Sequence, residues 1–497
     1  MDSENKDAFK ATESSVVDPW VAADESARVG YTAEVDKEAE KKLLRKLDLH
    51  LVPIVMLLYM MSFLDRVNIG NARLYKMTEN LNLVGNEYQM SVSIFYVTFL
   101  VFEVPSNLVL KKFTPSRYIA VLTFFWGIIC TLTGICQTYA QLLACRLLLG
   151  IFDAGLFPGL AIYLTMFYTK KELGLRIGYL FVSAAIAGAC GGLLAYGIGH
   201  MSGIRGMEGW RWIFILEGIL TVLLGAAVPF LLPNQPEDIS FLSKDERELL
   251  ALRKSLEVGQ TSSAQELHWS DVKKAFTTWY CWVFYFAQFG CGTMLYGYSN
   301  FLPTIIDGLG GWSIPLAQAL TIPCYTVGAI SYLIVAYLSD RWQQRGLFVA
   351  GFGIVSIIGY ALLISDVPFG VHYFACFVVA TGLYVVVGLP LAWLPANAPR
   401  YGMRTAATGM QLTIGTSSGI MSSFIYPTNE GPRYIKGHTI TMAMVAYSTV
   451  VFICLSLWFR YANRRRAEGK DDHHANGLSE DETNELGHGS PNFHFTY

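Results

Sequence analysis

Twelve long apolar runs constrain this chain more than any other feature of its sequence. Six of them lie at 50–70, 88–110, 116–136, 140–166, 176–200 and 211–232, and six more at 277–303, 316–338, 346–365, 371–391, 405–427 and 438–460. A helix needs about 20 apolar residues to cross roughly 30 Å of hydrocarbon. In lipid, a spanning backbone must also satisfy its own hydrogen bonds. The runs therefore predict an all-α integral membrane protein with twelve transmembrane helices in two six-helix halves.

A polar interval at 233–276 separates the two sets of runs. Its charged residues, among them Glu237 and Asp238, cannot enter lipid. We predict a cytosolic linker there, between a six-helix bundle at 48–232 and a second, duplicated bundle at 277–460. A polar cytosolic tail at 1–47 precedes them. The tail at 461–497 has too little apolar content after Ala467 to fold, so we expect disorder in it, with His473 and His474 solvated in preference to binding metal.

The distribution of basic residues predicts the orientation. Ten Lys and Arg residues fall in the short loops on the side of the N-terminus, and six fall in the loops on the other side. Basic loops are retained in the cytosol. We therefore expect a multi-pass protein with both termini in the cytosol, and we expect the plasma membrane as its location.

Composition argues against several other classes of protein. The net charge is only −2 and no basic stripe appears outside short loops and tails, so we expect no nucleic-acid partner. The nine cysteines lie in or beside apolar runs, which favours small core residues over disulfides or metal ligands. No nucleophile, metal cluster or phosphate loop stands out, so we expect no enzyme and no cofactor. The expected partners are the lipid bilayer and a small solute, and we expect a monomer.

Four ionisable residues inside the predicted spans stand out: Asp65, Arg66, Arg146 and Asp153. Each costs on the order of 3 kcal/mol in mid-membrane, so each needs a partner or a purpose. By helical rise, Asp65 and Arg146 share a depth, and Asp153 lies two turns beyond Arg146 on the same face, about 10 Å deeper.

Their chemistry suggests a division of roles. The guanidinium of Arg66 stays charged and matches a carboxylate, so we expect it to anchor a small organic anion. Buried aspartates can exchange protons as their surroundings change, so we assign proton coupling to Asp65, Arg146 and Asp153 and expect ionised Asp153 to pair with Arg146. The alternatives are a static latch between helices and, for Arg66, a snorkelling side chain.

Other polar residues in the spans are weaker candidates. Glu103 is expected near the inner gate, in contact with Lys111 or Arg117, and Glu217 is expected to be a packing contact. Gly188, Gly192 and Gly419 favour close helix packing, or sliding of those helices, and Pro158 and Pro390 are possible bending points. We assign substrate contacts to Tyr96, Gln288, Tyr296, Asn300 and Tyr384, although any one of them can be an ordinary interhelix contact.

The chain resembles the major facilitator superfamily over about 48–460, and within it the anion:cation symporter family and its fungal allantoate-permease-like branch. The most specific motifs are FLDRVNIG at 63–70 and, from Arg146, R-x3-G-x2-DAG-x2-PG at 146–159. Supporting segments are EVPSN at 103–107, WRWIF-x2-EG at 210–218 and FLP at 301–303. The resemblance implies the major facilitator fold, alternating access and proton-coupled anion binding at Asp65, Arg66, Arg146 and Asp153.

The resemblance also identifies gate residues. The superfamily's loop motif is present as Ser339-Asp340-Arg341-x3-Arg345-Gly346, which assigns Asp340 and Arg341 to the gate. Its counterpart at 110–117, which ends in Arg117, lacks the acidic residue, as is common in that branch. Glu103 and Arg117 complete the gate candidates.

The expected function is therefore a proton-coupled symporter that imports a small organic anion, such as a carboxylate vitamin or a nitrogen-source metabolite. These motifs do not separate family substrates such as nicotinate, pantothenate, biotin or allantoate. One alternative is a proton antiporter exporting a drug or secondary metabolite; such exporters carry a proline in the fifth helix, which is absent here. Another is a nutrient-sensing, transporter-like receptor, which short tails disfavour.

Overall fold

The computed structural model describes residues 37–110, 113–235, 239–257, 268–427, 430–471, 477, 483 and 486–497. The chain divides into two units, residues 1–45 and 46–497, and the arrangement below is that of the second unit. Within the first, the described residues belong to the start of helix α2 (Lys37–His50). Lys111, Lys112, Glu237, Asp238, His473 and His474 lie outside the described residues.

All twelve apolar runs form helices, and the described residues contain no strand. The helices of the first half are α3 (Val52–Leu74), α5 (Glu87–Leu110), α6 (Pro115–Thr133), α7 (Tyr139–Asp153) continued by α8 (Leu156–Thr165), α9 (Lys170–Gly199) and α10 (Gly209–Leu231). Those of the second half are α14 (Trp279–Leu309), α16 (Thr321–Trp342), α17 (Arg345–Ile364), α18 (Phe369–Ala396), α19 (Tyr401–Phe424) and α20 (Ile435–Ala467). The predicted twelve-helix fold in two halves is confirmed.

Nine of the described helices are long and apolar enough to cross a membrane by length and composition. Helices α5, α14 and α19 are not among the nine; in α14 and α19, tyrosine, glycine, serine and threonine interrupt the apolar residues. Both face the interior between the halves. Several of their polar side chains, such as Gln288, Tyr296 and Thr416, therefore line the space between the halves and do not face lipid.

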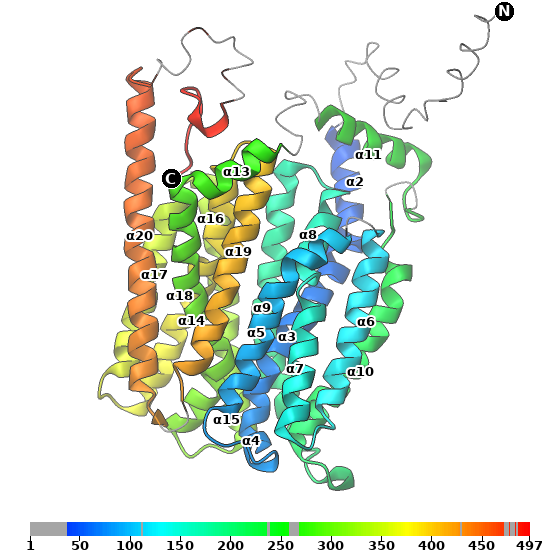
Figure 1. Cartoon of the computed structure of the whole chain (residues 1–497), viewed down its shortest axis with the longest axis vertical. Coiled ribbons are helices and arrows are strands. Elements are labelled where there is room, and N and C mark those ends of the chain that lie inside the picture. Colours follow the sequence, from blue (N-terminus) through cyan, green and yellow to red (C-terminus); the bar gives the residue numbers. More distant parts are fainter. Residues whose placement is uncertain are drawn as a thin grey trace, which may run out of the picture. The chain divides into compact units, whose positions relative to one another are not determined.

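Short helices mark the two ends of the helical bundle. α4 (Met77–Asn80) and α15 (Ile314–Ala319) lie at one end, which we call the α4 end, and the linker helices α11 (Lys244–Glu257) and α13 (Trp269–Thr277) lie at the other, which we call the α13 end (Figure 1). Arg400 at the start of α19 donates from Nε to Asp271 of α13 at 2.6 Å. This buried ion pair fixes part of the linker against the second half.

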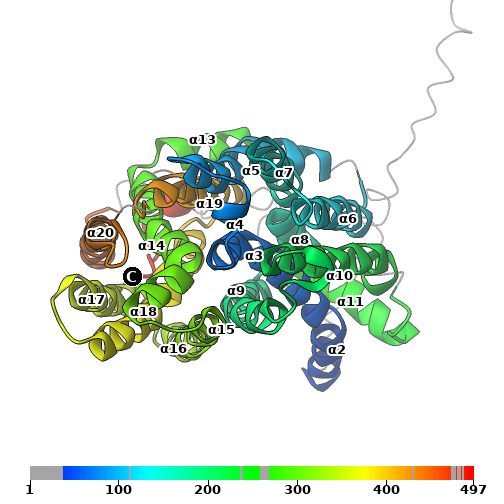
Figure 2. The same cartoon turned by 90° about the horizontal axis from the view of Figure 1, so that it is seen from below.

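Pairs of packed helices hold each half together, and other pairs join the two halves. In the first half α6 packs on α10, α3 on α9 and α5 on α7; in the second half α14 packs on α19 and α17 on α18 and α20. Between the halves, α3 packs on α14, α5 on α19 and α9 on α16, and α3 and α14 lie in the middle when the bundle is seen end-on (Figure 2). This arrangement places α3, α5, α14 and α19 around the centre.

Glycines allow the halves to touch toward the α4 end. A Cβ on Gly70 would lie 2.2 Å from the carbonyl oxygen of Asn300, and one on Gly419 would lie 2.5 Å from the ring of Tyr96. Gly188 and Gly192 of α9 face α16 in the same way, at 2.6 and 2.4 Å from its atoms. Only glycine permits backbones this close. The close-packing interpretation of these glycines is confirmed, and the interface is tight at this end.

The end of the chain differs from the expected disorder. Residues 486–497 pack on α18 and α20: Trp393 donates from Nε1 to the carbonyl oxygen of Thr496 at 2.7 Å, and Asn463 exchanges two 2.8 Å hydrogen bonds with the backbone of Phe495. The Phe495 ring stacks on Phe459 at 4.7 Å. The prediction was wrong for these residues because the low average apolar content of the tail hides a small aromatic cluster at its end.

Candidate functional site

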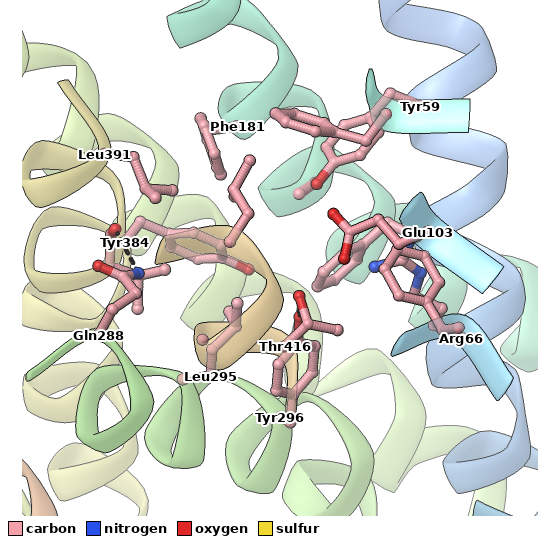
Figure 3. A pocket seen from close by; sticks show the side chains of 18 residues that line it. Tyr59, Arg66, Glu103, Phe181, Gln288, Leu295, Tyr296, Tyr384, Leu391 and Thr416 are labelled. Carbon is pink, nitrogen blue, oxygen red and sulfur yellow. Dashed lines mark hydrogen bonds between the residues drawn. The ribbon is translucent and has the colours of Figure 1, made fainter. Parts of the chain in front are cut away.

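A cavity lies between the two halves, at the middle of the bundle. Its free volume is about 60 Å³, well below the roughly 300–1,000 Å³ of a typical small-molecule site, so the cavity is narrow in this conformation. Its walls are mainly aromatic and aliphatic, and its polar lining comes from both halves: Arg66, Glu103, Gln288, Tyr296, Tyr384 and Thr416. Figure 3 shows Arg66 and Glu103 together on one side of the cavity and Gln288 with Tyr384 on the other.

Arg66 and Asp153 form a buried ion pair at the cavity wall. Arg66 donates from Nε to Asp153 Oδ2 at 2.8 Å, and its Nη2 lies 2.8 Å from the same oxygen. Ser62, one turn earlier on α3, donates to Asp153 Oδ1 at 2.6 Å. Arg66 is 7% exposed and Asp153 1% exposed, so neither faces lipid and the snorkelling alternative for Arg66 is wrong.

The expected pairing of Asp153 with Arg146 was wrong. The two residues are separated by two helical turns, about 10 Å along the axis, which is more than an arginine side chain spans. Asp153 is the last residue of α7, and the chain then bends through Ala154 and Gly155 into α8, which holds Pro158. At this bend Asp153 faces α3, and its partner comes from there.

Aromatic rings cover the rest of the Arg66 guanidinium. Its central carbon lies 4.8 Å from the Phe99 ring centre and 5.7 Å from that of Phe95, both on α5. Ring faces attract cations, and they also exclude water from one side of the group. The guanidinium is therefore held in place and remains able to meet a planar anion on its cavity side.

Glu103 is the second acidic group of the cavity. It is 5% exposed and accepts a 2.9 Å hydrogen bond from Thr413 Oγ1 of α19, which joins the two halves. The expected contact with Lys111 or Arg117 is not what the structure shows: Arg117 is exposed, and Lys111 lies outside the described residues. Glu103 is thus a cavity residue as well as a contact between halves.

The predicted substrate contacts divide into two groups. Gln288, Tyr296 and Tyr384 line the cavity; Gln288 donates to the Val387 carbonyl oxygen at 3.1 Å, and the buried Tyr384 hydroxyl has no partner among the described residues.

Tyr96 and Asn300 do not line the cavity but close it toward the α4 end. Asn300 Nδ2 donates to the Tyr96 hydroxyl at 3.3 Å, and the Tyr96 and Tyr296 rings meet at 4.8 Å. These contacts cross between the halves, so they must break if the cavity opens at that end.

Asp65 and Arg146 belong to a separate buried cluster. Neither lines the cavity. As their predicted depths imply, they lie close enough to interact electrostatically. Cys130 of α6 donates its thiol to Asp65 Oδ1 at 3.1 Å, and Glu217 of α10 accepts a hydrogen bond from Asn68 Nδ2. Sequence reasoning treated Glu217 as packing and missed this grouping, although an acid in the middle of an apolar run was a usable signal.

The remaining gate candidates lie at the α13 end. Asp340 and Arg341 are exposed, and Asp340 accepts from Arg345 Nη2 at 3.3 Å. Arg345 also donates to the carbonyl oxygen of Ala392 on α18. These contacts tie α16 and α17 to the end of α18. None of them reaches the cavity lining.

Comparisons with known proteins agree with this architecture. A family model described as Major Facilitator Superfamily matches residues 55–423. An uncharacterized transporter of Schizosaccharomyces pombe is 41% identical over 431 residues, which are 86% of each chain. The high-affinity nicotinic acid transporter of Saccharomyces cerevisiae is 31% identical over 427 residues, covering 86% of this chain and 79% of that protein.

Solved structures show the same fold. An inward-facing, unoccupied bacterial homolog of the human lysosomal transporter Spinster aligns with a TM-score of 0.65 over 85% of this chain and 98% of that chain, at 14% identity.

Proposed function

The chain belongs to the major facilitator superfamily and is a multi-pass membrane transporter, and from this premise we propose that it imports a small organic anion together with protons. The observation that carries the proposal is the buried Arg66–Asp153 pair at the wall of the cavity between the halves. One permanent cation there is paired with one group that can be neutralised.

A proton on Asp153 makes Arg66 available to a substrate. Removing one partner of a buried ion pair leaves an uncompensated charge that costs about 3–5 kcal/mol. When Asp153 is protonated, a substrate carboxylate restores the balance by accepting the Nε and Nη2 hydrogen bonds that Asp153 now takes. When Asp153 is ionised, it competes with the substrate for the same donors. Anion binding and proton binding therefore favour each other.

The walls favour a small, flat, partly apolar anion. Phe99 and Tyr296 offer ring faces, and Gln288 and Thr416 offer polar contacts opposite Arg66. An aromatic monocarboxylate fits this combination. The nicotinic acid transporter among the relatives supports nicotinate as the first compound to test. Import, cytosolic termini and a plasma-membrane location complete the proposal.

The test is uptake of labelled nicotinate, pantothenate, biotin and allantoate by cells expressing the chain, at acid and neutral external pH. We expect one of them to accumulate faster at acid pH. Arg66→Gln should abolish this uptake, whereas Arg464→Gln, which removes an arginine that is 81% exposed, should not. Uptake that ignores external pH and survives Arg66→Gln would overturn the proposal, and efflux driven by an inward proton gradient would favour the exporter alternative.

A further inference from the structure

The buried cluster behind the cavity contains two carboxyl groups and one arginine. Asp65 and Glu217 are 1% and 3% exposed, and Arg146 is 2% exposed. α6 and α10 are pressed together beside it: a Cβ on Gly218, the residue after Glu217, would lie 2.4 Å from the backbone nitrogen of Thr131. The cluster is therefore sealed against lipid and is separate from the cavity.

Charge is unbalanced if both acids are ionised. Asp65 interacts with Arg146, with Glu217 and, toward the cavity, with Asp153, whereas no basic side chain of the described part of the chain interacts with Glu217. The other groups that face Glu217 are Asn68 on α3, Cys130 on α6 and Cys190 on α9, none of them cationic. A buried net negative charge is strongly disfavoured, and one proton removes it. Because Arg146 favours the charged form of Asp65, that proton belongs on Glu217.

The hydrogen-bond pattern independently leaves room for this proton. Asn68 donates to Glu217 Oε2, and Cys130 donates to Asp65 Oδ1. Oε1 of Glu217 and Oδ2 of Asp65 are buried and have no partner among the described residues, as are Nε and Nη2 of Arg146. A carboxylic acid supplies a donor where a carboxylate has only acceptors. Polar atoms left open in this way also favour bound water between the three groups.

We propose that Glu217 holds a proton as the acid member of a carboxyl pair with Asp65, in a site distinct from the anion cavity, and that Arg146 keeps Asp65 ionised. The inference rests on the proposed function in one respect, since it adds a second proton-binding site to a proton-coupled transporter. Because the charge of Asp65, on α3, acts on Glu217, the two carboxyl groups titrate as a pair. α3 also carries Arg66, so this site and the cavity share a helix.

The test is infrared difference spectroscopy of the full-length protein in lipid nanodiscs, between neutral and alkaline pH. The probe is the carbonyl stretch of a protonated carboxylic acid, which shifts in D2O. We expect the wild-type spectrum at neutral pH to contain a band from Glu217, which Glu217→Gln removes and Glu79→Gln, which removes an exposed acid, leaves in place; a band from a protonated acid of the cavity stays in both variants. Asp65→Asn should make the band disappear at a lower pH, because the negative charge of Asp65 no longer opposes the ionisation of Glu217.

A wild-type spectrum without the band, or a band that Glu217→Gln leaves unchanged, would overturn the inference. If Glu217→Gln does not fold, Asn68→Ala gives the answer instead: it removes the hydrogen bond to Glu217, so the band must change frequency, and an unchanged band counts against the site. The readout needs no substrate. Failure of the uptake panel therefore refutes the proposed function alone. Absence of the band from the wild-type spectrum, with proton-driven uptake intact, refutes this inference alone.

Discussion

Replacing Gly192 with alanine tests whether the halves must touch at the α4 end. Gly192 lies on α9 against the junction of α15 and α16 in the second half, where an added Cβ would be 2.4 Å from Thr321 Oγ1 and 2.8 Å from the carbonyl oxygen of Gln318. Ordinary contact distances begin at 3.4 Å. Because packed interiors have no spare space, the helices must separate by about 1 Å to admit the methyl group.

The size of the effect follows from overpacking. Inserting a methyl group into a packed contact costs about 1–3 kcal/mol. Here the cost falls on the conformation closed at the α4 end and not on one in which the helices have moved apart. A difference of that size shifts the equilibrium about 5- to 150-fold toward opening. Gly197 of the same helix is the matched control, because nothing lies within 4 Å of its Cβ position. There alanine adds up to about 1 kcal/mol of helix stability to both conformations alike.

The assay is thiol labelling of Leu295→Cys, a position in the cavity lining, in a background without the nine native cysteines. In this background, Cys130→Ser keeps a hydrogen-bond donor for Asp65. We expect a membrane-impermeant maleimide applied from the α4 side to label Gly192→Ala at least about five times faster than the parent, and Gly197→Ala at the parent rate. Equal rates for the two alanine variants would refute the reasoning.

Three further perturbations test other parts of the structure. Asp153→Asn should keep exchange of anion for anion in proteoliposomes but lose accumulation driven by a pH gradient, because an amide does not take up and release a proton near neutral pH; preserved accumulation would contradict the role of Asp153. Phe495→Ala should destabilise the protein by about 2–4 kcal/mol and lower its melting temperature, because the ring is 4% exposed and stacks on Phe459. His494→Ala, at an exposed position, is the control. Equal melting temperatures for the two variants would show that the end of the chain does not contribute to stability. Lys46 lowers the pKa of Glu246 by a hydrogen bond, so this pair stabilises the fold above the carboxyl group's unfolded pKa and is lost as pH falls through the folded pKa. The pair is exposed and contributes less than about 1 kcal/mol, so Lys46→Met should have a slightly lower melting temperature than wild type at pH 7. This difference in melting temperature should vanish in acid; a difference that grows in acid would contradict the reasoning.

The twelve helices could be predicted because the membrane imposes a local requirement. Each span must bring about 20 apolar residues, and this can be counted along the chain without knowing its neighbours. The end of the chain imposed no such requirement. Its order depends on Phe495 meeting Phe459 and on Thr496 meeting Trp393, contacts between residues distant in sequence. The average composition of the tail cannot show which distant residues its side chains contact.

The same distinction, between local requirements and contacts of residues distant in sequence, applies to the candidate site. An ionisable residue within an apolar run is visible at once, and all four that were singled out are buried away from lipid. Helical periodicity also gave the shared depth of Asp65 and Arg146. It could not give the rotation of one helix against another or the bend after Asp153, and those decide that Asp153 meets Arg66. Glu217 was visible too, but its importance comes from Asp65 and Asn68 on another helix.

The pairing of Asp153 with Arg66, in place of the expected pairing with Arg146, changes the charge balance of the whole first half. Had Asp153 paired with Arg146, Glu103 would be the one acid beside Arg66 among the described residues of the cavity. Instead the cavity holds Arg66 with Asp153 and Glu103, and the buried cluster holds Arg146 with Asp65 and Glu217. Each site has one cation and two acids, so each is neutral with one proton bound. An entering monoanion adds one negative charge to the cavity, and neutrality there is restored when the second acid is protonated. Under the proposed function, one proton therefore accompanies each monovalent anion, because a site this poorly hydrated does not hold an unbalanced charge.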